Sequence, residues 1–199
     1  MFDLRIKVDA AAAARQVKDI AQNQIPFTTA LALTRTAQKA QAAVQKSLPA
    51  LFIIRRGSWA LGGVRIEAAT KRMLTAVVKD INPYMGLQET GGTKFPMGKN
   101  IAVPLRGARA SRRSLISEQN KPRQLLDSGR GFILRLPKSG REFICTWRGR
   151  RKGLAFMYVL IPRAEIHKAY HFGETVQATV QKVFESTFAA AWEEVKARG

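Results

Sequence analysis

Two clusters of basic side chains hold the residues of this 199-residue chain that are best suited to chemistry. The first cluster consists of Arg106, Arg109, Arg112 and Arg113, and the second of Arg148, Arg150, Arg151 and Lys152. A guanidinium binds phosphate or carboxylate through parallel hydrogen bonds, so arginines in loops are suited to contact with a polyanion or an acidic partner. The alternative is a pair of solvated turns whose charge keeps a hairpin edge from aggregating. The sequence favours neither interpretation over the other.

The whole chain shares this positive charge. Lys and Arg number 34 against 14 Asp and Glu, which gives a formal net charge of +20. Such an excess attracts polyanions and makes a compact monomer repel itself. Nucleic acid, an anionic membrane surface or an acidic protein would each supply the counter-charge, and a solvated basic surface without a dedicated ligand is the fourth interpretation.

The sequence contains no residue set with the spacing of a catalytic or metal site. Residues 92–100 resemble a phosphate-binding loop, but five residues separate its glycines instead of four, and Pro96 removes an N–H donor. His167 and His171 lack the intervening glutamate of a zinc protease. The single Cys145 excludes an internal disulfide and is predicted to be buried and reduced. We therefore expect no enzyme, no metal ion and no cofactor.

Targeting and membrane segments are not visible either. Residues 1–10 alternate between apolar and polar instead of forming the apolar core of a signal peptide. No apolar run approaches the roughly 20 residues that span a bilayer. These patterns predict a soluble protein made in a cytoplasm.

A predicted long helix at residues 25–48 is the element around which the chain is organised. Its apolar positions recur in steps of three and four, at Ala30, Leu33, Ala37, Ala40, Val44 and Leu48. This period is typical of an amphipathic helix, which we expect Pro26 to open and Pro49 to end. The alanines allow close approach by another part of the chain or by a neighbouring subunit.

The remaining periodicity predicts an α+β fold in which a mostly antiparallel sheet is packed by long helices. A strand is predicted at 2–8 and a helix from Asp9 to near Ile25, and the sequence leaves open whether this helix continues into the next one with a kink or turns back. Further along, the prediction is paired strands within 65–78, a strand end and a loop around 84–92, strands at 100–103, 132–136, 142–147 and 154–161, and a C-terminal amphipathic helix at 174–196. The basic segment 106–123 lacks periodicity and is predicted to be an extended loop or arm. We expect one domain, 1–199, with this segment as an insertion.

Three stretches carry a family resemblance. They are the alanine-rich helix that begins at 25–37, the segment 88–92 with Gly98-Lys99 and 101–104 after it, and Leu160-Ile161-Pro162 followed by the C-terminal helix. With these stretches in this order, the chain resembles the minor tail protein Z family, the tail-completion proteins of tailed bacteriophages, and related neck and tail-end components. The segment 106–123 has no counterpart in that pattern.

The resemblance implies a structural virion protein, assembled in the host cytoplasm, that completes the head-proximal end of the tail and helps it join the head at the neck. It implies a homo-oligomeric ring, often a hexamer, whose partners are neck, tail-terminator and tail-tube proteins, with packaged DNA as a further contact and no membrane. The candidate subunit interface is Leu33, Ala37, Ala40, Val44, Gly91 and Gly92. The alternative function is a basic nucleic-acid-binding protein that is not a virion component. A phage nuclease is a further rival, which the missing carboxylate cluster argues against.

Overall fold

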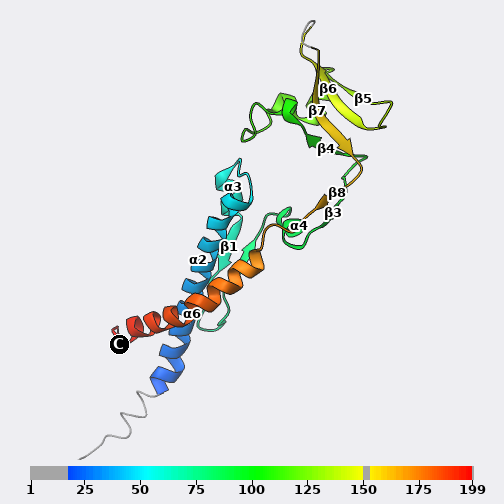
Figure 1. Cartoon of the computed structure of the whole chain (residues 1–199). Helices are drawn as coiled ribbons and strands as arrows, with labels where there is room; N and C mark the ends of the chain where they lie inside the picture. The colour runs from blue at the N-terminus through cyan, green and yellow to red at the C-terminus, as the bar shows by residue number, and fades with distance from the viewer. Residues whose placement is uncertain (1–17, 150–152, 199) are drawn as a thin grey trace, which may run out of the picture. The chain divides into compact units, whose positions relative to one another are not determined.

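The structure, a computed structural model, describes residues 18–149 and 153–198 (Figure 1). Helices and antiparallel strands make it an α+β fold, which confirms the predicted fold class. The described chain divides into two compact units: unit 1 holds residues 18–48, 61–82 and 171–198, and unit 2 holds 49–60, 83–149 and 153–170. The predicted strand at 2–8 and the start of the helix after it lie outside the described residues. That the two units form one domain stays a prediction.

The first helical segment of unit 1 continues into the long helix at Ile25. A π-helical turn, η1 (Ile20–Gln24), leads directly into α2 (Ile25–Leu51), and the Ile25 N–H donates to the Ile20 carbonyl. Pro26 has no N–H, and in a regular helix its ring crowds the carbonyl four residues earlier. The wider π turn gives the ring room, so the chain continues from one helical segment into the next, which is one of the two outcomes that the sequence left open.

Pro49 does not end the long helix either. α2 includes Pro49 and ends at Leu51. The proline removes one helical hydrogen bond, to the carbonyl of Gln45, and only two helical residues follow it. Because this loss falls in the last turn, the helix tolerates it, and the predicted long helix itself is confirmed.

Unit 1 is built on α2. The strands β1 (Val64–Glu67) and β2 (Val77–Asp80) pair antiparallel, which confirms the predicted strand pair. The Gln41 side chain donates to the Val64 carbonyl at 2.7 Å, and so connects α2 to β1. The C-terminal helix α6 (Phe172–Lys196), predicted at 174–196, crosses α2 (Figure 1). Lys39 of α2 donates to the Thr187 hydroxyl of α6 at 2.8 Å.

An ion pair also connects these two helices and gives unit 1 a pH dependence. The Arg35 guanidinium lies 2.6 Å from the Glu194 carboxylate, and Arg198 lies 2.5 Å from the same carboxylate. The hydrogen bond from Arg35 is the largest cause that lowers the pKa of Glu194 below its ordinary value, and the charges of both arginines add to it. Because folding lowers the pKa of Glu194, the ion pair stabilises unit 1 fully at pH values above the pKa of this carboxyl in the unfolded chain, which is about 4.3. The stabilisation is lost as the pH falls through the lower pKa of the folded state.

We expect the Glu194 carboxyl to titrate in NMR with a midpoint below about 4.3, and Arg35→Gln to move that midpoint upwards. Lys196→Gln is the control, because it also removes one positive charge. Lys196 pairs with Glu193, at 3.6 Å, so this change should leave the midpoint of Glu194 almost unchanged. Equal midpoints in wild type and Arg35→Gln would contradict the assignment.

Unit 2 contains a four-stranded antiparallel sheet in the order β4-β7-β6-β5. Its strands are β4 (Ile101–Pro104), β7 (Leu154–Ile161), β6 (Glu142–Trp147) and β5 (Gly131–Arg135). All four predicted strands are therefore confirmed, two of them with identical bounds. The short helix α3 (Gly57–Gly62) begins in this unit.

The segment before the sheet differs from the prediction. A helix, α4 (Met85–Thr90), stands where a strand end was expected, and Gly91, at φ 72°, follows it with its N–H on the Leu87 carbonyl. A glycine adopts this left-handed conformation readily, so it ends the helix. The expected loop around Gly91-Gly92 includes the start of a strand, β3 (Gly92–Lys94). It pairs with β8 (Ala164–Ile166), which the sequence analysis missed.

The basic segment 106–123 has only short elements, but it lies on the sheet instead of extending from it. It contains the turns η2 (Arg106–Ala108) and η3 (Glu118–Asn120) and runs into α5 (Pro122–Asp127). Ala108, Ile116 and Leu125 pack into one core with Ile144, Ala155, Met157 and Tyr158 of the sheet. The buried Tyr158 hydroxyl donates to the Asn120 carbonyl at 2.6 Å. One face of the sheet is thus covered by residues 106–127.

Candidate functional site

Four arginines of unit 2 surround one cavity of about 660 Å³. Its lining consists of Arg55, Arg106, Arg109 and Arg112 together with Pro104, Leu105, Ala110 and Ser111. Three of these arginines were predicted from the sequence as one group, whereas the fourth, Arg55, was not. The only signal for Arg55 was its place in Arg55-Arg56-Gly57, which is typical of a turn.

A close backbone contact with the sheet fixes two of the four arginines. The Leu105 N–H donates to the Met157 carbonyl of β7 at 2.8 Å, and Ala108 is completely buried. Between them, Gly107 lies so close to β7 that a Cβ atom there would be 2.5 Å from the Phe156 carbonyl oxygen. Arg106 and Arg109 therefore leave the chain on either side of a turn that the Leu105 hydrogen bond and the buried Ala108 hold against the sheet.

A second turn holds the other wall of the cavity. Ser111 and Ser114 are joined by reciprocal hydrogen bonds in which each hydroxyl accepts the other residue's N–H, at 2.8 and 3.1 Å, and the Ser114 hydroxyl also donates to the Ser111 carbonyl at 2.9 Å. The Arg109 guanidinium donates to the Ser114 carbonyl at 3.1 Å, and the Arg55 guanidinium donates to the Arg112 carbonyl at 3.2 Å. Since a guanidinium has five N–H donors, both arginines keep donors for a ligand.

The positive charge of the cavity is not neutralised within the described part of the chain. There, none of the four arginines forms an ion pair with a carboxylate. Partial burial lowers the pKa of Arg55 below its ordinary value, and the neighbouring charges of Arg109 and Arg112 lower it further. A bound anion would relieve this repulsion, so the arrangement is chemically suited to hold one.

Two of the other predicted basic residues lie outside the lining of this cavity. Arg113 is exposed and does not line the cavity, and Arg148 is exposed at the end of β6. Arg150, Arg151 and Lys152 lie outside the described residues. Whether that second cluster contacts a polyanion stays a prediction.

The predicted subunit-interface residues lie mostly inside the units. Ala37, Ala40 and Val44 are at most 5% exposed, because the chain's own packing in unit 1 covers them. Leu33 and Gly91 are half-buried, and Gly92 is exposed at the start of β3. An interface at these six residues stays a prediction, and the three buried ones offer no surface to a partner in this conformation.

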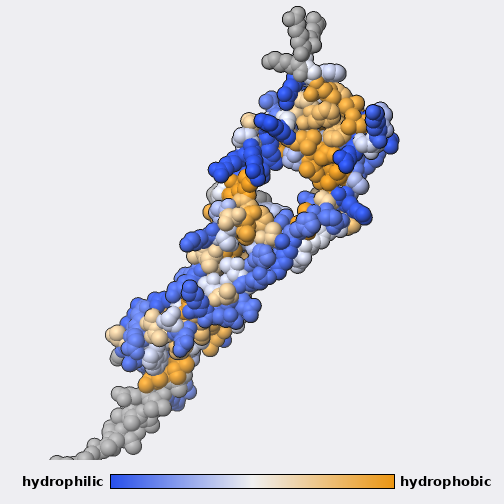
Figure 2. Space-filling model, viewed as in Figure 1, coloured by the Kyte–Doolittle hydropathy of each residue, from blue (hydrophilic) through white to orange (hydrophobic). Residues whose placement is uncertain are grey.

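The second face of the main sheet is apolar and open. Strand register places Leu134, Phe143, Val159 and Val103 in one row across all four strands, and Phe132, Cys145 and Phe156 in the next row. Phe156 is 37% exposed, and Trp147, beside Phe132 at a ring distance of 5.8 Å, is 69% exposed. Figure 2 shows a continuous hydrophobic surface over β5, β6 and β7. Sequence periodicity hid this face, because every residue of β7 is apolar and alternation therefore does not separate its two faces.

Cys145 confirms the prediction of a buried cysteine, and its reduced state stays a prediction. It is completely buried and free, and burial raises the pKa of its thiol above the ordinary value. A neutral thiol is a poor nucleophile, so its role is packing.

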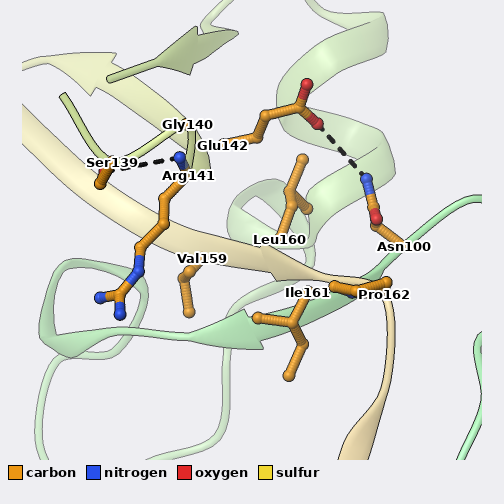
Figure 3. Close-up of a pocket in the computed structure, with 9 residues that line it drawn as sticks. All are labelled: Asn100, Ser139, Gly140, Arg141, Glu142, Val159, Leu160, Ile161 and Pro162. Carbon is orange, nitrogen blue, oxygen red and sulfur yellow. Dashed lines mark hydrogen bonds between the residues drawn. The ribbon is translucent and has the colours of Figure 1, made fainter. Parts of the chain in front are cut away.

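A second cavity, of about 580 Å³, lies where β6 begins and β7 ends, and one carboxylate lines it (Figure 3). The Asn100 amide donates to the Glu142 carboxylate at 3.4 Å, while the Arg141 guanidinium points away from that carboxylate (Figure 3). A lone carboxylate paired with an amide has no partner for general acid–base work.

The two histidines are not arranged as metal ligands. His171, at φ 53°, precedes α6 and places its Nδ1 2.8 Å from Glu174, while His167 is exposed. Among the described residues, no three His, Cys, Asp or Glu side chains come close enough together to hold a metal ion.

Two further findings bear on the class of the protein. None of the helices in the described ranges has the length and apolar character that crossing a membrane requires. Compared with known proteins, the chain matches no protein-family model, no curated protein and no solved structure.

Proposed function

We propose that this chain is a structural protein of a tailed-phage virion that completes the head-proximal end of the tail and helps it join the head. It acts by assembling into a ring of identical subunits at the neck, and its partners are the neck, tail-terminator and tail-tube proteins. Catalysis has no part in this function.

The open apolar face of the β4-β7-β6-β5 sheet is the observation that carries this proposal. Two rows of aliphatic and aromatic side chains lie across four strands, with Trp147 and Phe156 exposed. Contiguous apolar surface of this kind typically marks a contact with another protein. The resemblance of the sequence to tail-completion proteins supports a copy of the same chain as one such partner.

Electron microscopy of particles from a phage that lacks this protein tests the function. We expect filled heads beside separate tails, or tails with an aberrant upper end, and restoration when the wild-type chain is supplied. Normal joined virions without the protein would overturn the proposal.

A pair of exposed aromatic residues allows a sharper test of assembly. Trp147 on the sheet face and Phe95 on a loop are both 69% exposed. Trp147→Asp should abolish the oligomer seen by sedimentation and fail to restore virions, because it places a charge in the apolar contact. Phe95→Asp makes a similar change outside the face and should assemble normally. Equal assembly of both variants would show that this face is not the interface.

The alternative, a nucleic-acid-binding protein outside the virion, is favoured by one observation, the arginine-lined cavity. It predicts normal virions in the deletion experiment together with DNA binding by the isolated chain.

A further inference from the structure

We propose that the cavity formed by Arg55, Arg106, Arg109 and Arg112 binds the phosphodiester backbone of a nucleic acid, without reading its bases. The inference rests on this cavity alone and holds whether or not the chain completes a phage tail.

The cavity is arranged to hold a phosphate, and not only to touch one in a transient surface contact. Arg55 and Arg109 are each held by one hydrogen bond to a backbone carbonyl, so part of their rotamer entropy is already lost before a ligand arrives. Their remaining N–H groups can donate to phosphate oxygens in the bidentate way that guanidinium favours. Arg106 and Arg112 supply two further guanidiniums, and their side chains take part in no hydrogen bond or ion pair within the described residues.

The composition of the lining favours contact with the nucleic-acid backbone over recognition of its bases. Besides the arginines, the cavity presents proline, leucine, alanine and serine. It has no aromatic ring on which a base can stack, and no Asn, Gln, Asp or Glu that would read a base edge. An arginine can also read a guanine edge, but Arg55 and Arg109 are each held by a backbone carbonyl. The proposal therefore assigns the guanidiniums to phosphates, which are contacts that position a nucleic acid independently of sequence.

Charge favours a nucleic acid over an acidic protein. A nucleic acid carries a phosphate at every nucleotide, so it brings several closely spaced charges to one cavity. An acidic protein must order one flexible carboxylate side chain for each arginine and loses rotamer entropy each time. The net charge of +20 also steers a polyanion towards the chain over long distances.

Two double variants of the full chain test the proposal. Arg106→Gln with Arg112→Gln removes two cavity charges, while the backbone carbonyl of residue 112 stays available to Arg55. Arg130→Gln with Arg163→Gln removes the same charge from exposed positions of unit 2 outside the lining, and serves as the matched control. The described residues give none of these four side chains a hydrogen bond or ion pair, so all variants should fold and unfold like the wild type.

The readout is the fluorescence anisotropy of a labelled mixed-sequence DNA duplex over a series of salt concentrations. We expect wild type to bind with a steep negative slope of log K against log salt. The cavity variant should reduce that slope by about 2 and weaken binding on the order of 10–100-fold, independently of duplex sequence. Each single cavity variant should reduce the slope by about 1, and the control should keep nearly the wild-type slope.

Two results would overturn the proposal. Equal losses in the cavity variant and the control would mean that binding follows net charge and not this site. Displacement of the duplex by polyglutamate at the same charge concentration would assign the cavity to an acidic protein partner.

Discussion

Replacing Leu125 by alanine is expected to lower the free energy of unfolding of unit 2 by about 2–5 kcal/mol. Leu125 is completely buried in α5 and belongs to the core that joins residues 106–127 to the sheet. Truncation removes buried apolar contacts and leaves a cavity between α5 and the sheet. The cavity cannot close easily, because Gly131 already lies so near that a Cβ on it would be 2.9 Å from the Leu125 Cβ.

Urea unfolding followed by circular dichroism measures this loss. Leu126 is the matched control: it is the next residue of the same helix but is 37% exposed, so Leu126→Ala should cost about 1 kcal/mol. Similar losses in the two variants would mean that the segment does not pack on the sheet as described. The same result would also mean that residues 106–127 do not hold three of the cavity arginines, Arg106, Arg109 and Arg112, against the sheet.

Gly107→Ala is expected to lower the free energy of unfolding by about 1–3 kcal/mol and also to weaken anion binding. The added Cβ would lie 2.5 Å from the Phe156 carbonyl oxygen, a backbone atom within β7 that cannot rotate away. The turn must therefore retreat from the sheet and strain the bond from Leu105 to Met157. Arg106 and Arg109 would move with it, although every arginine is still present.

Gly98→Ala controls for the change of residue type. Nothing lies within 4 Å of a Cβ at Gly98 and its φ is ordinary, so we expect a change of about 0.5 kcal/mol or less. Thermal unfolding and the DNA titration together make the test. Unchanged stability in Gly107→Ala would show that the turn is free to move, and unchanged binding would show that its position does not set the affinity.

The sequence predicts the regular elements of this fold well, for a local physical reason. β6 and β7 have the predicted bounds, and α6 begins two residues earlier than predicted, because their apolar periodicity reports which side chains are buried. The rule that Pro49 ends the long helix failed, because a proline in the last helical turn removes only one hydrogen bond and two residues can still follow it.

The candidate site was only partly predictable, because it depends on contacts between residues distant in the chain. Arg55 joins Arg112 across 57 residues, and no local pattern reports such a contact. Residues 106–123 looked like a free arm because they are aperiodic, yet Ala108 and Ile116 pack on the sheet. The open apolar face depends on strand order, which brings Val103 beside Val159 and is not encoded in either strand alone.

The single buried cysteine makes the stability of unit 2 measurable separately from that of unit 1. Cys145 is the only thiol of the chain and lies in the central strand β6, where an alkylating reagent cannot reach it in the closed state. Its labelling rate therefore reports the fraction of molecules in which this sheet is open, when reclosing is faster than labelling. One mass shift per molecule then counts opening events of unit 2 alone, whatever the helices of unit 1 are doing.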